Sequence, residues 1–312
     1  CFMEVSSHGI HQKRTAGLSF KGGIFTNLTH DHLDYHKSFA EYRNVKKIFF
    51  DQLPSEAFAL VNLDDKNGAF MLQNTHAKKY GYALKTQADY KAKILENQFQ
   101  GLLLNIDGQE IWTKLIGTFN AYNLLAIYAA ADLMGMEKID NLRILSDLDN
   151  VDGRFQHAIS KSGINAIIDY AHTPDALKNV LETINAIRTY NEQVITVVGC
   201  GGERDRDKRP KMGNIASSLS DVVVFTSDNP RGEDPELIIQ EVEAGVRPEN
   251  YKKTISITDR KQAIKTACKL AQSGDIILVA GKGHETYQII GDQRADFDDY
   301  KIASEILTEL NK

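Results

Sequence analysis

The sequence contains little cysteine and no long apolar run. Its three cysteines, Cys1, Cys200 and Cys268, lie far apart. They exclude a disulfide framework and a cysteine-based zinc site, so we expect a reducing, cytoplasmic environment. No apolar stretch approaches the roughly 18 residues of a membrane-spanning helix, so no such helix is expected. We also find no internal repeat and no low-complexity segment.

The sequence also lacks an excess of basic residues. Lysine and arginine together number 37, against 42 aspartates and glutamates, which gives a net charge of -5. This balance argues against nucleic acids and anionic membrane surfaces as partners. A chain of 312 residues that is 42% hydrophobic and 25% charged is typical of a globular protein with two domains.

Strands and helices alternate regularly in the second half of the chain. Continuous apolar strands separated by helices indicate an α/β fold whose mostly parallel sheet is covered on both faces. We expect strands at 166–169, 194–198, 222–225 and 276–279, and helices at 174–188, 211–218, 235–246, 260–271 and 300–310. The predicted domains span residues 1–152 and 153–312.

The first half mixes short strands with helices. We expect strands at 22–27 and 57–62, further strands between 84 and 116, and an apolar helix over 121–134. One turn is expected at Asp107-Gly108, a dipeptide that commonly joins antiparallel strands. The apolar residues after Cys1 predict that Glu4 ends a strand, so that the chain begins inside a domain.

Asp228, Asn229, Pro230 and Arg231 directly follow the expected strand 222–225. Proline fixes φ and restricts the residue before it, which favours a rigid turn at the end of that strand. An arginine fork binds a carboxylate through two parallel hydrogen bonds. Ligands of α/β sheets bind beyond the carboxyl ends of the strands, so Arg231 lies where a substrate carboxylate would be held. The alternative is a surface turn with a solvated arginine.

A glycine-rich loop at 199–202 follows another buried strand and precedes the basic run 203–209, which includes Arg204. Glycines allow the backbone to approach a ligand closely, and basic residues suit a phosphate or a carboxylate. The loop lacks the spacings of the phosphate loop and of the dinucleotide-binding motif. A flexible solvated loop is therefore the alternative.

A second loop, 281–285, places Gly281 and Glu285 at the same edge of the sheet as Arg204 and Arg231. Two arginines and one glutamate that converge on a crevice fit a zwitterionic ligand, whose ammonium group faces the acid. The segment 169–175 closes a fourth strand at this edge. Four polar strand ends in one domain are difficult to attribute to turns alone.

A helix is expected after a capping box at residues 38–41. Its periodicity predicts that Lys46 lies on the apolar face, among aromatic side chains. Lys47 is predicted to share the polar face with Arg43 and Asp51.

Lys46 is a candidate for covalent modification. Desolvation lowers the pKa of a lysine held against apolar side chains. A neutral amine reacts with carbon dioxide to give an anionic carbamate, which is able to ligate magnesium. Glu4 and His32 would supply further ligands. A snorkelling lysine among helix-capping polar groups is the alternative.

Asn120 and Asn123 open the long apolar helix of the first half. Their amides are suited to hydrogen bonds with the edge of an adenine ring. They are equally suited to cap the helix, in which case no ligand is needed.

Together these segments resemble the Mur ligase family of bacterial cell-wall enzymes, from residues 4–9 to the final helix. The order and spacing of the motifs are highly specific, and the turn 228–231 resembles the version that accepts meso-diaminopimelate rather than L-lysine. The resemblance implies the later part of a central ATPase-type α/β domain, followed by a Rossmann-like C-terminal domain that binds the amino acid.

The resemblance assigns roles to individual residues. It implies a catalytic set of a carbamylated Lys46, His32 and Glu4, which also ligate magnesium. The UDP-linked substrate would contact Ser6, Gln12 and Arg14, and ATP would contact Asn120, Asn123, Arg154 and Asp169. The amino-acid pocket would consist of Arg204, Asp228, Asn229, Pro230, Arg231, Gly281 and Glu285.

The implied reaction is ATP-dependent amide formation in peptidoglycan biosynthesis, and hence in cell-wall biogenesis, cell shape and cell division. The D-glutamate carboxylate of a UDP-N-acetylmuramoyl dipeptide attacks the γ-phosphate of ATP to give an acyl phosphate. The amine of diaminopimelate then displaces phosphate, while Mg²⁺ stabilises the transferring group. ATP and Mg²⁺ are the expected cofactors, and we expect a monomer without nucleic-acid or membrane partners.

The sequence departs from the family pattern in one respect. In the family, the phosphate loop and a uridine-binding domain precede the segment that matches Glu4, and this sequence begins after both. We therefore expect an incomplete, inactive fragment whose amino-acid pocket is nevertheless intact.

Two alternatives remain. Folylpolyglutamate synthetase is a related ligase with the same general layout, but the turn 228–231 and the loop 281–285 favour a doubly zwitterionic amino acid. A non-catalytic binding protein is the second alternative, and the presence of Lys46, Glu4 and His32 argues against it.

Overall fold

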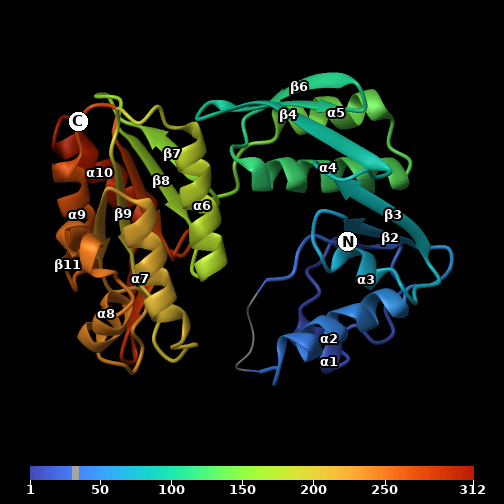
Figure 1. Cartoon of the computed structure of the whole chain (residues 1–312), viewed down its shortest axis with the longest axis horizontal. Helices are drawn as coiled ribbons and strands as arrows, with labels where there is room; N and C mark the ends of the chain where they lie inside the picture. Colours follow the sequence, from blue (N-terminus) through green and yellow to red (C-terminus); the bar gives the residue numbers. More distant parts are fainter. Residues whose placement is uncertain (30–34) are drawn as a thin grey trace. The chain divides into compact units, whose positions relative to one another are not determined.

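The protein was analysed as a computed structural model that describes residues 1–29 and 35–312. The chain divides into two compact units, Cys1–Asp149 and Asn150–Lys312, each with its own sheet (Figure 1). None of the helices in the described ranges is long and apolar enough to cross a membrane.

The first unit contains a six-stranded sheet in which the strands follow the order of the sequence. The four strands β1 to β4 pair in parallel, and β5 and β6 continue the sheet as antiparallel neighbours. The strands are β1 (Gly22–Phe25), β2 (Phe58–Asn62), β3 (Lys78–Ala83), β4 (Tyr90–Gln98), β5 (Gly101–Ile106) and β6 (Gln109–Thr113). The helices are α1 (Ser7–His11), α2 (Phe39–Asp51), α3 (Gly68–Met71), α4 (Thr118–Leu133) and α5 (Lys138–Asp147).

Side chains of β2 alternate between two cores, one on each face of this sheet. Leu60 packs in the core formed with α4 and the β4–β6 strands, whereas Ala59 and Val61 pack in the core beneath α2. This alternation follows from the period of two in a strand. A strand buried on both faces must be apolar throughout, which explains why the sequence predicted β2 so closely.

The turn between β5 and β6 was predicted correctly. Asp107 and Gly108 both have positive φ values, 50° and 83°, as a two-residue hairpin of the I′ type requires. The Asp107 carboxylate also accepts hydrogen bonds from the Tyr128 hydroxyl (3.0 Å) and the Lys138 ammonium (3.1 Å). The turn is thereby fastened to α4 and α5.

The predicted first strand around Glu4 is wrong. Residues 1–6 form no strand, and the side chains of Phe2 and Met3 are exposed. Apolar residues become a strand only where a neighbouring strand satisfies their backbone groups. In the described residues the only strand paired with β1 is β2.

The second unit contains a six-stranded sheet in the order β11-β10-β9-β12-β8-β7, in which all strands except the edge strand β7 are parallel. These strands are β7 (Gln156–Ile159), β8 (Asn165–Asp169), β9 (Val194–Val198), β10 (Val222–Phe225), β11 (Thr254–Ser256) and β12 (Ile276–Ala280). A separate hairpin consists of β13 (Tyr287–Ile290) and β14 (Gln293–Asp296). The predicted mostly parallel α/β architecture is confirmed.

Helices cover both faces of this sheet, as the continuous apolar strands predicted. α9 (Arg260–Leu270) and α10 (Asp299–Glu309) share one core with Ile195 and Val197 of β9. The remaining helices are α6 (Pro174–Ile187), α7 (Lys208–Leu219) and α8 (Pro235–Glu243), with a short 3-10 helix at Pro248–Lys253. Thr196 points to the opposite side, where its hydroxyl lies 2.7 Å from that of Ser220 at the end of α7.

Candidate active site

Three parallel strands of the second unit end side by side. β9 lies between β10 and β12, and Val198 of β9 pairs with both Phe225 of β10 and Ala280 of β12. The loops that follow these strands therefore begin next to one another. This is the edge at which α/β sheets bind their ligands.

Asn229, Lys282 and Glu285 form a polar cluster at this edge. The Asn229 amide donates to Glu285 Oε2 over 2.8 Å, and the Lys282 ammonium donates to the same oxygen over 3.0 Å and to Asn229 Oδ1 over 3.1 Å. Lys282 has no exposed surface, and a buried charge of this kind requires a partner. The sequence analysis missed Lys282, because a lysine between two glycines is typical of an exposed loop.

Arg231 is held by backbone groups and is not a solvated residue on a surface turn. Its Nη1 donates to the carbonyl oxygens of Gly202 (2.8 Å) and Asn229 (3.3 Å). Its backbone pairs with the β13–β14 hairpin, through bonds with Ile289 (3.2 Å) and Gly291 (2.7 Å). Its φ of 52° lies in the left-handed region, which is uncommon for a residue other than glycine and marks a constrained position.

Asp228 lies between the strand end and Gly281. Its Oδ1 accepts the backbone N–H of Asn229 over 2.6 Å. A Cβ at Gly281 would lie 2.7 Å from Asp228 Oδ2, and Gly281 has a φ of 117°. Only glycine fits there.

A buried ion pair fastens the ends of β10 and β12 behind this cluster. Arg260 donates to both oxygens of Asp299 (2.9 and 2.7 Å), and both side chains have no exposed surface. The same guanidinium donates to the carbonyl oxygens of Ala280 (3.0 Å) and Ser227 (3.4 Å). The two loop origins are therefore held together by one side chain.

The loop at 199–202 is held in place, so the alternative of a flexible solvated loop is wrong. Gly202 N–H donates to the Asn229 carbonyl (2.9 Å), and a Cβ on Gly202 would lie 1.9 Å from the oxygen of Pro230. Cys200 is 3% exposed within this loop, and burial raises the pKa of its thiol to about 12.

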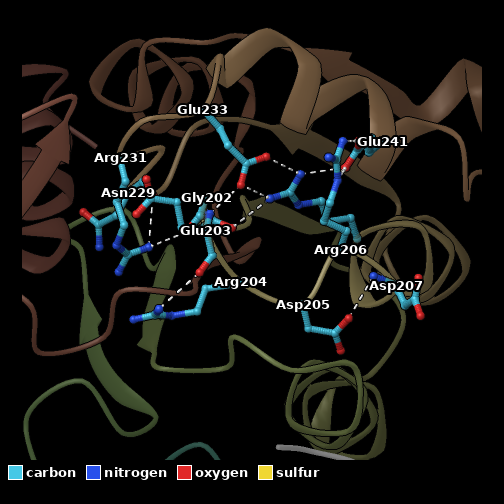
Figure 2. A network of polar contacts seen from close by, with 12 residues as sticks. Gly202, Glu203, Arg204, Asp205, Arg206, Asp207, Asn229, Arg231, Glu233 and Glu241 are labelled. Carbon is cyan, nitrogen blue, oxygen red and sulfur yellow. Dashed lines mark hydrogen bonds and ion pairs between the residues drawn. The ribbon is translucent and has the colours of Figure 1, made fainter. Parts of the chain in front are cut away.

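Glutamates neutralise two of the four basic residues in the run after this loop (Figure 2). Arg206 pairs with Glu241, and the buried Arg209 pairs with Glu233 (2.9 Å) and Glu241 (2.6 Å). Arg204 differs: within the described residues its hydrogen bond is to the Glu203 carbonyl (3.2 Å), and none is to a carboxylate. Two arginines of the run therefore already have acidic partners, and neither of them was assigned to the pocket.

Asp169 and Arg154 lie beside the loop that starts at Gly281. The Gly281 N–H donates to the Asp169 carbonyl (3.0 Å), and the Asp169 carboxylate accepts from the N–H of Phe155 (2.7 Å). Burial raises the pKa of Asp169 to about 6, against the opposing effects of that N–H and of Arg154. The Arg154 guanidinium lies 4.7 Å from the centre of the Tyr170 ring.

Asn120 and Asn123 belong to the first unit, whereas Arg154 and Asp169 belong to the second. The Asn120 amide donates to the Ile116 carbonyl (2.8 Å) and its oxygen accepts from the Asn123 amide (3.2 Å). The helix-capping alternative is wrong, because the N-cap of α4 is Gly117 and both asparagines lie inside the helix. Asn123 is exposed.

Glu4, Ser6 and Lys46 line one groove of about 940 Å³ in the first unit. The Lys46 ammonium lies 5.5 Å from the ring of Tyr42. A carbamate on Lys46 would add an anionic ligand that an unmodified lysine cannot supply. His32 lies outside the described residues. Within the described part, no group of three or more His, Cys, Asp and Glu residues is placed to hold a metal.

Lys47 is buried, and it shares a face of α2 with Arg43 and Asp51 as predicted. It forms an ion pair with Asp51, and its ammonium lies 5.7 Å from the ring of Phe70 in α3. Arg43 lies on the same ring at 4.1 Å. The short helix α3 covers this side of α2, and no periodicity within α2 was able to reveal it. The capping box is present, since Ser38 Oγ accepts the N–H of Glu41 (3.2 Å).

The residues expected to hold the UDP-linked substrate are surface residues around α1. Ser6 Oγ accepts the N–H of Gly9 (3.0 Å) as the helix cap, and both Gln12 and Arg14 are exposed. The sequence analysis missed the buried His36, whose Nε2 lies 2.9 Å from Ser7 Oγ and whose ring stacks on Tyr42. No spacing pattern pointed to it.

Two α/β units, with a cluster of polar side chains at the strand ends of the second, define the class of protein. The chain belongs to the Mur ligase family: residues 1–131 match the Mur ligase middle domain, and residues 153–283 match the glutamate ligase domain of Mur ligases. The family resemblance of the sequence is thereby confirmed.

Individual relatives are more specific. The chain is 57% identical, over its whole length and 64% of the relative, to the UDP-N-acetylmuramoyl-L-alanyl-D-glutamate--2,6-diaminopimelate ligase of Cytophaga hutchinsonii. It is 54% identical to the ligase of the same name from Bacteroides thetaiotaomicron, over 98% of the chain and 63% of that protein. The chain thus spans slightly less than two thirds of these relatives.

Solved structures agree on the fold. A structure of a ligase with the same name is 36% identical, with a TM-score of 0.64, over 98% of this chain and 64% of that one. A folylpolyglutamate synthase of Thermotoga maritima matches at 14% identity with a TM-score of 0.60, over 83% of this chain and 57% of that one, which indicates a shared fold alone.

Proposed function

We propose that this chain is part of an ATP-dependent ligase that adds meso-diaminopimelate to UDP-N-acetylmuramoyl-L-alanyl-D-glutamate in peptidoglycan biosynthesis. The names of its relatives support the reaction. The observation that carries the proposal is the arrangement of Arg231, Asn229 and Glu285 at one edge of the sheet, on loops that follow β10 and β12, the two strands that flank β9.

The chemistry of this edge suits an amino-acid head group. Within the described residues, the hydrogen bonds to the Glu285 carboxylate all go to Oε2, so Oε1 is the atom proposed to receive a ligand ammonium. Arg231 uses Nη1 for backbone carbonyls, and Nη2 and Nε are proposed to bind the distal carboxylate of diaminopimelate. Arg204, Asp228, Pro230 and Gly281 complete the proposed pocket.

L-Lysine lacks the distal carboxylate and would leave Arg231 without its partner. A site built around a polar group rejects an analogue that lacks it by up to ~10⁴-fold. Selectivity for diaminopimelate over lysine is therefore the expected signature of this pocket.

The other substrates are proposed to bind residues of both units. Asn120, Asn123, Arg154 and Asp169 would contact ATP, and Ser6, Gln12 and Arg14 would contact the UDP-linked substrate. A carbamylated Lys46, with Glu4 and His32, would hold Mg²⁺, which stabilises charge on a transferring phosphoryl group when bound. We further propose a cytoplasmic, monomeric enzyme.

Calorimetric titration of this chain with meso-diaminopimelate, and separately with L-lysine, tests the pocket. We expect selective binding of diaminopimelate and its loss in Arg231→Ala. Equal or tighter binding of lysine would overturn the substrate assignment. Absence of binding by either ligand would contradict the pocket itself and would favour a different amino acid, as for a folylpolyglutamate synthetase.

A further inference from the structure

The Gly202–Glu203 peptide group lies between an arginine and a glutamate. Its carbonyl oxygen accepts from Arg231 Nη1 (2.8 Å), and its N–H donates to the Glu233 carboxylate. A trans peptide is planar, so its C=O and N–H point in opposite directions. Whatever fixes the N–H therefore fixes the direction in which the carbonyl faces Arg231.

Glu233 is itself fixed by a buried guanidinium. Arg209 donates from Nη2 to Glu233 Oε1 and from Nη1 to Oε2, both over 2.9 Å, which is the two-point geometry of a strong ion pair. Arg209 has no exposed surface. Its Nη2 also donates to the Gly201 carbonyl (3.3 Å), so the same side chain supports the loop from a second direction.

The electrostatics agree with this geometry. The hydrogen bonds from Arg209, together with that from the Glu203 N–H, lower the pKa of Glu233 to about 2. Glu233 is therefore a carboxylate throughout the neutral range, and it remains an acceptor for the peptide N–H.

The backbone at Glu203 and Arg231 has a conformation that requires support from neighbouring side chains. Glu203 and Arg231 both have left-handed φ values, 55° and 52°. Non-glycine residues occupy this region at a cost and remain there only when their surroundings impose it. In Figure 2 the side chain of Glu233 points toward Glu203 from one side, while Arg231 lies on the other.

We propose that Glu233, held by Arg209, is a positioning residue that sets the direction of the Arg231 guanidinium and thereby the selectivity for a ligand with a second carboxylate. The proposal rests on the proposed function, because it assigns the distal carboxylate of the amino acid to Arg231. Glu233 acts through the Gly202–Glu203 peptide and is not assigned any contact with the ligand.

Glu233→Ala and Glu241→Ala provide a matched pair of variants. Each removes one carboxylate from Arg209, but only Glu233 accepts the Glu203 N–H. We expect Glu233→Ala to weaken diaminopimelate binding about tenfold or more while leaving lysine binding unchanged, since a charged hydrogen bond loses its alignment. Glu241→Ala should keep the ratio of the dissociation constants for diaminopimelate and lysine within about twofold of the wild-type ratio. An unchanged ratio in Glu233→Ala, or an equal fall in both variants, would overturn the proposal.

A second measurement needs no ligand and separates this proposal from the proposed function. We expect amide hydrogen exchange at Glu203, and the NMR mobility of the Arg231 Nε–H group, to increase in Glu233→Ala but not in Glu241→Ala. If the wild type binds neither amino acid while these signals change as expected, the assigned pocket fails and the positioning of Arg231 stands. If they do not change, the positioning role fails even where selective binding is found.

Discussion

The strand-end cluster of the second unit and the groove of the first unit are built in opposite ways. At the strand ends, side chains are fixed by buried partners, as Lys282 fixes Glu285 and Arg260 fastens two strand ends. In the groove, Glu4 is exposed and precedes the first helix on a segment without regular structure. The proposed amino-acid pocket therefore consists of groups that the fold of its unit fixes, whereas the proposed magnesium set depends on chemistry added to Lys46.

The largest expected effect tests the groove. In a form that includes the additional length of the relatives, Lys46→Ala should abolish phosphate release, because the proposed carbamate would be lost. Added bicarbonate should partly restore a weakened wild type but not the variant. Lys37→Ala is the control, since Lys37 is exposed and contributes its backbone N–H to the cap of α2. Undiminished turnover in Lys46→Ala would remove the contrast between the two sites.

The next largest effect tests how the strand ends of the second unit are held together, through the buried Arg260–Asp299 pair. Asp299→Ala should destabilise the second unit by about 3–5 kcal/mol, because it leaves a buried guanidinium without its partner. The loss of stability is measured by urea denaturation, with hydrogen exchange used to monitor the unfolding of each unit. Lys114→Ala, in the exposed Lys114–Asp149 pair of the first unit, should cause no measurable change.

If Asp299→Ala leaves the free energy of unfolding nearly unchanged, the strand ends are held by the backbone alone. The double variant Arg260→Met/Asp299→Leu should recover much of the lost stability, since it removes both charges from the interior. Failure of this recovery would indicate that the bonds of Arg260 to Ala280 and Ser227 matter more than its charge.

The smallest effect is a difference in pH dependence between the units. Burial raises the pKa of Asp169 to about 6, so the folded second unit binds a proton more tightly than the unfolded chain. This stabilisation is complete below the unfolded pKa near 3.8 and is lost as the pH rises through 6, by about 3 kcal/mol at most. Asp169→Asn should abolish it.

Asp64 of the first unit should behave in the opposite way. Burial alone would raise its pKa, but hydrogen bonds from Thr86, Lys85 and Tyr122 lower it. Its contribution is therefore present above the unfolded pKa and is lost as the pH falls below that value. Hydrogen exchange between about pH 2.5 and 7, a range that extends below the unfolded pKa of a carboxylate, should give opposite trends at the two sites, and parallel trends would contradict this assignment.

Much of the fold was predictable because it depends on local patterns. β9 and β10 were predicted to the residue, since Val222–Phe225 is apolar throughout, Val194–Val198 is interrupted only by Thr196, and both runs end at glycine or a polar residue. The capping box at Ser38 and the turn at Asp107 depend on residues at most three positions apart.

The ion pairs that support the candidate site were not predictable, because the two residues of each pair lie far apart in the sequence. Arg209 and Glu233 are separated by 24 positions, and Arg260 and Asp299 by 39. Each of these charges alone is typical of a surface residue, and only the fold buries it. The same reason explains why the burial of Lys47 was not foreseen, since its face of α2 is covered by α3.

The buried thiol of Cys200 provides a way to measure how often the loop 199–202 opens, through its rate of chemical modification. The three cysteines differ in accessibility: Cys1 is exposed, whereas Cys200 and Cys268 are buried. A thiol reagent should therefore modify one position at once and the other two only as the structure opens. Because Cys200 lies in the loop that faces Arg231, its rate of modification reports how often that loop opens in solution, without any change to the sequence.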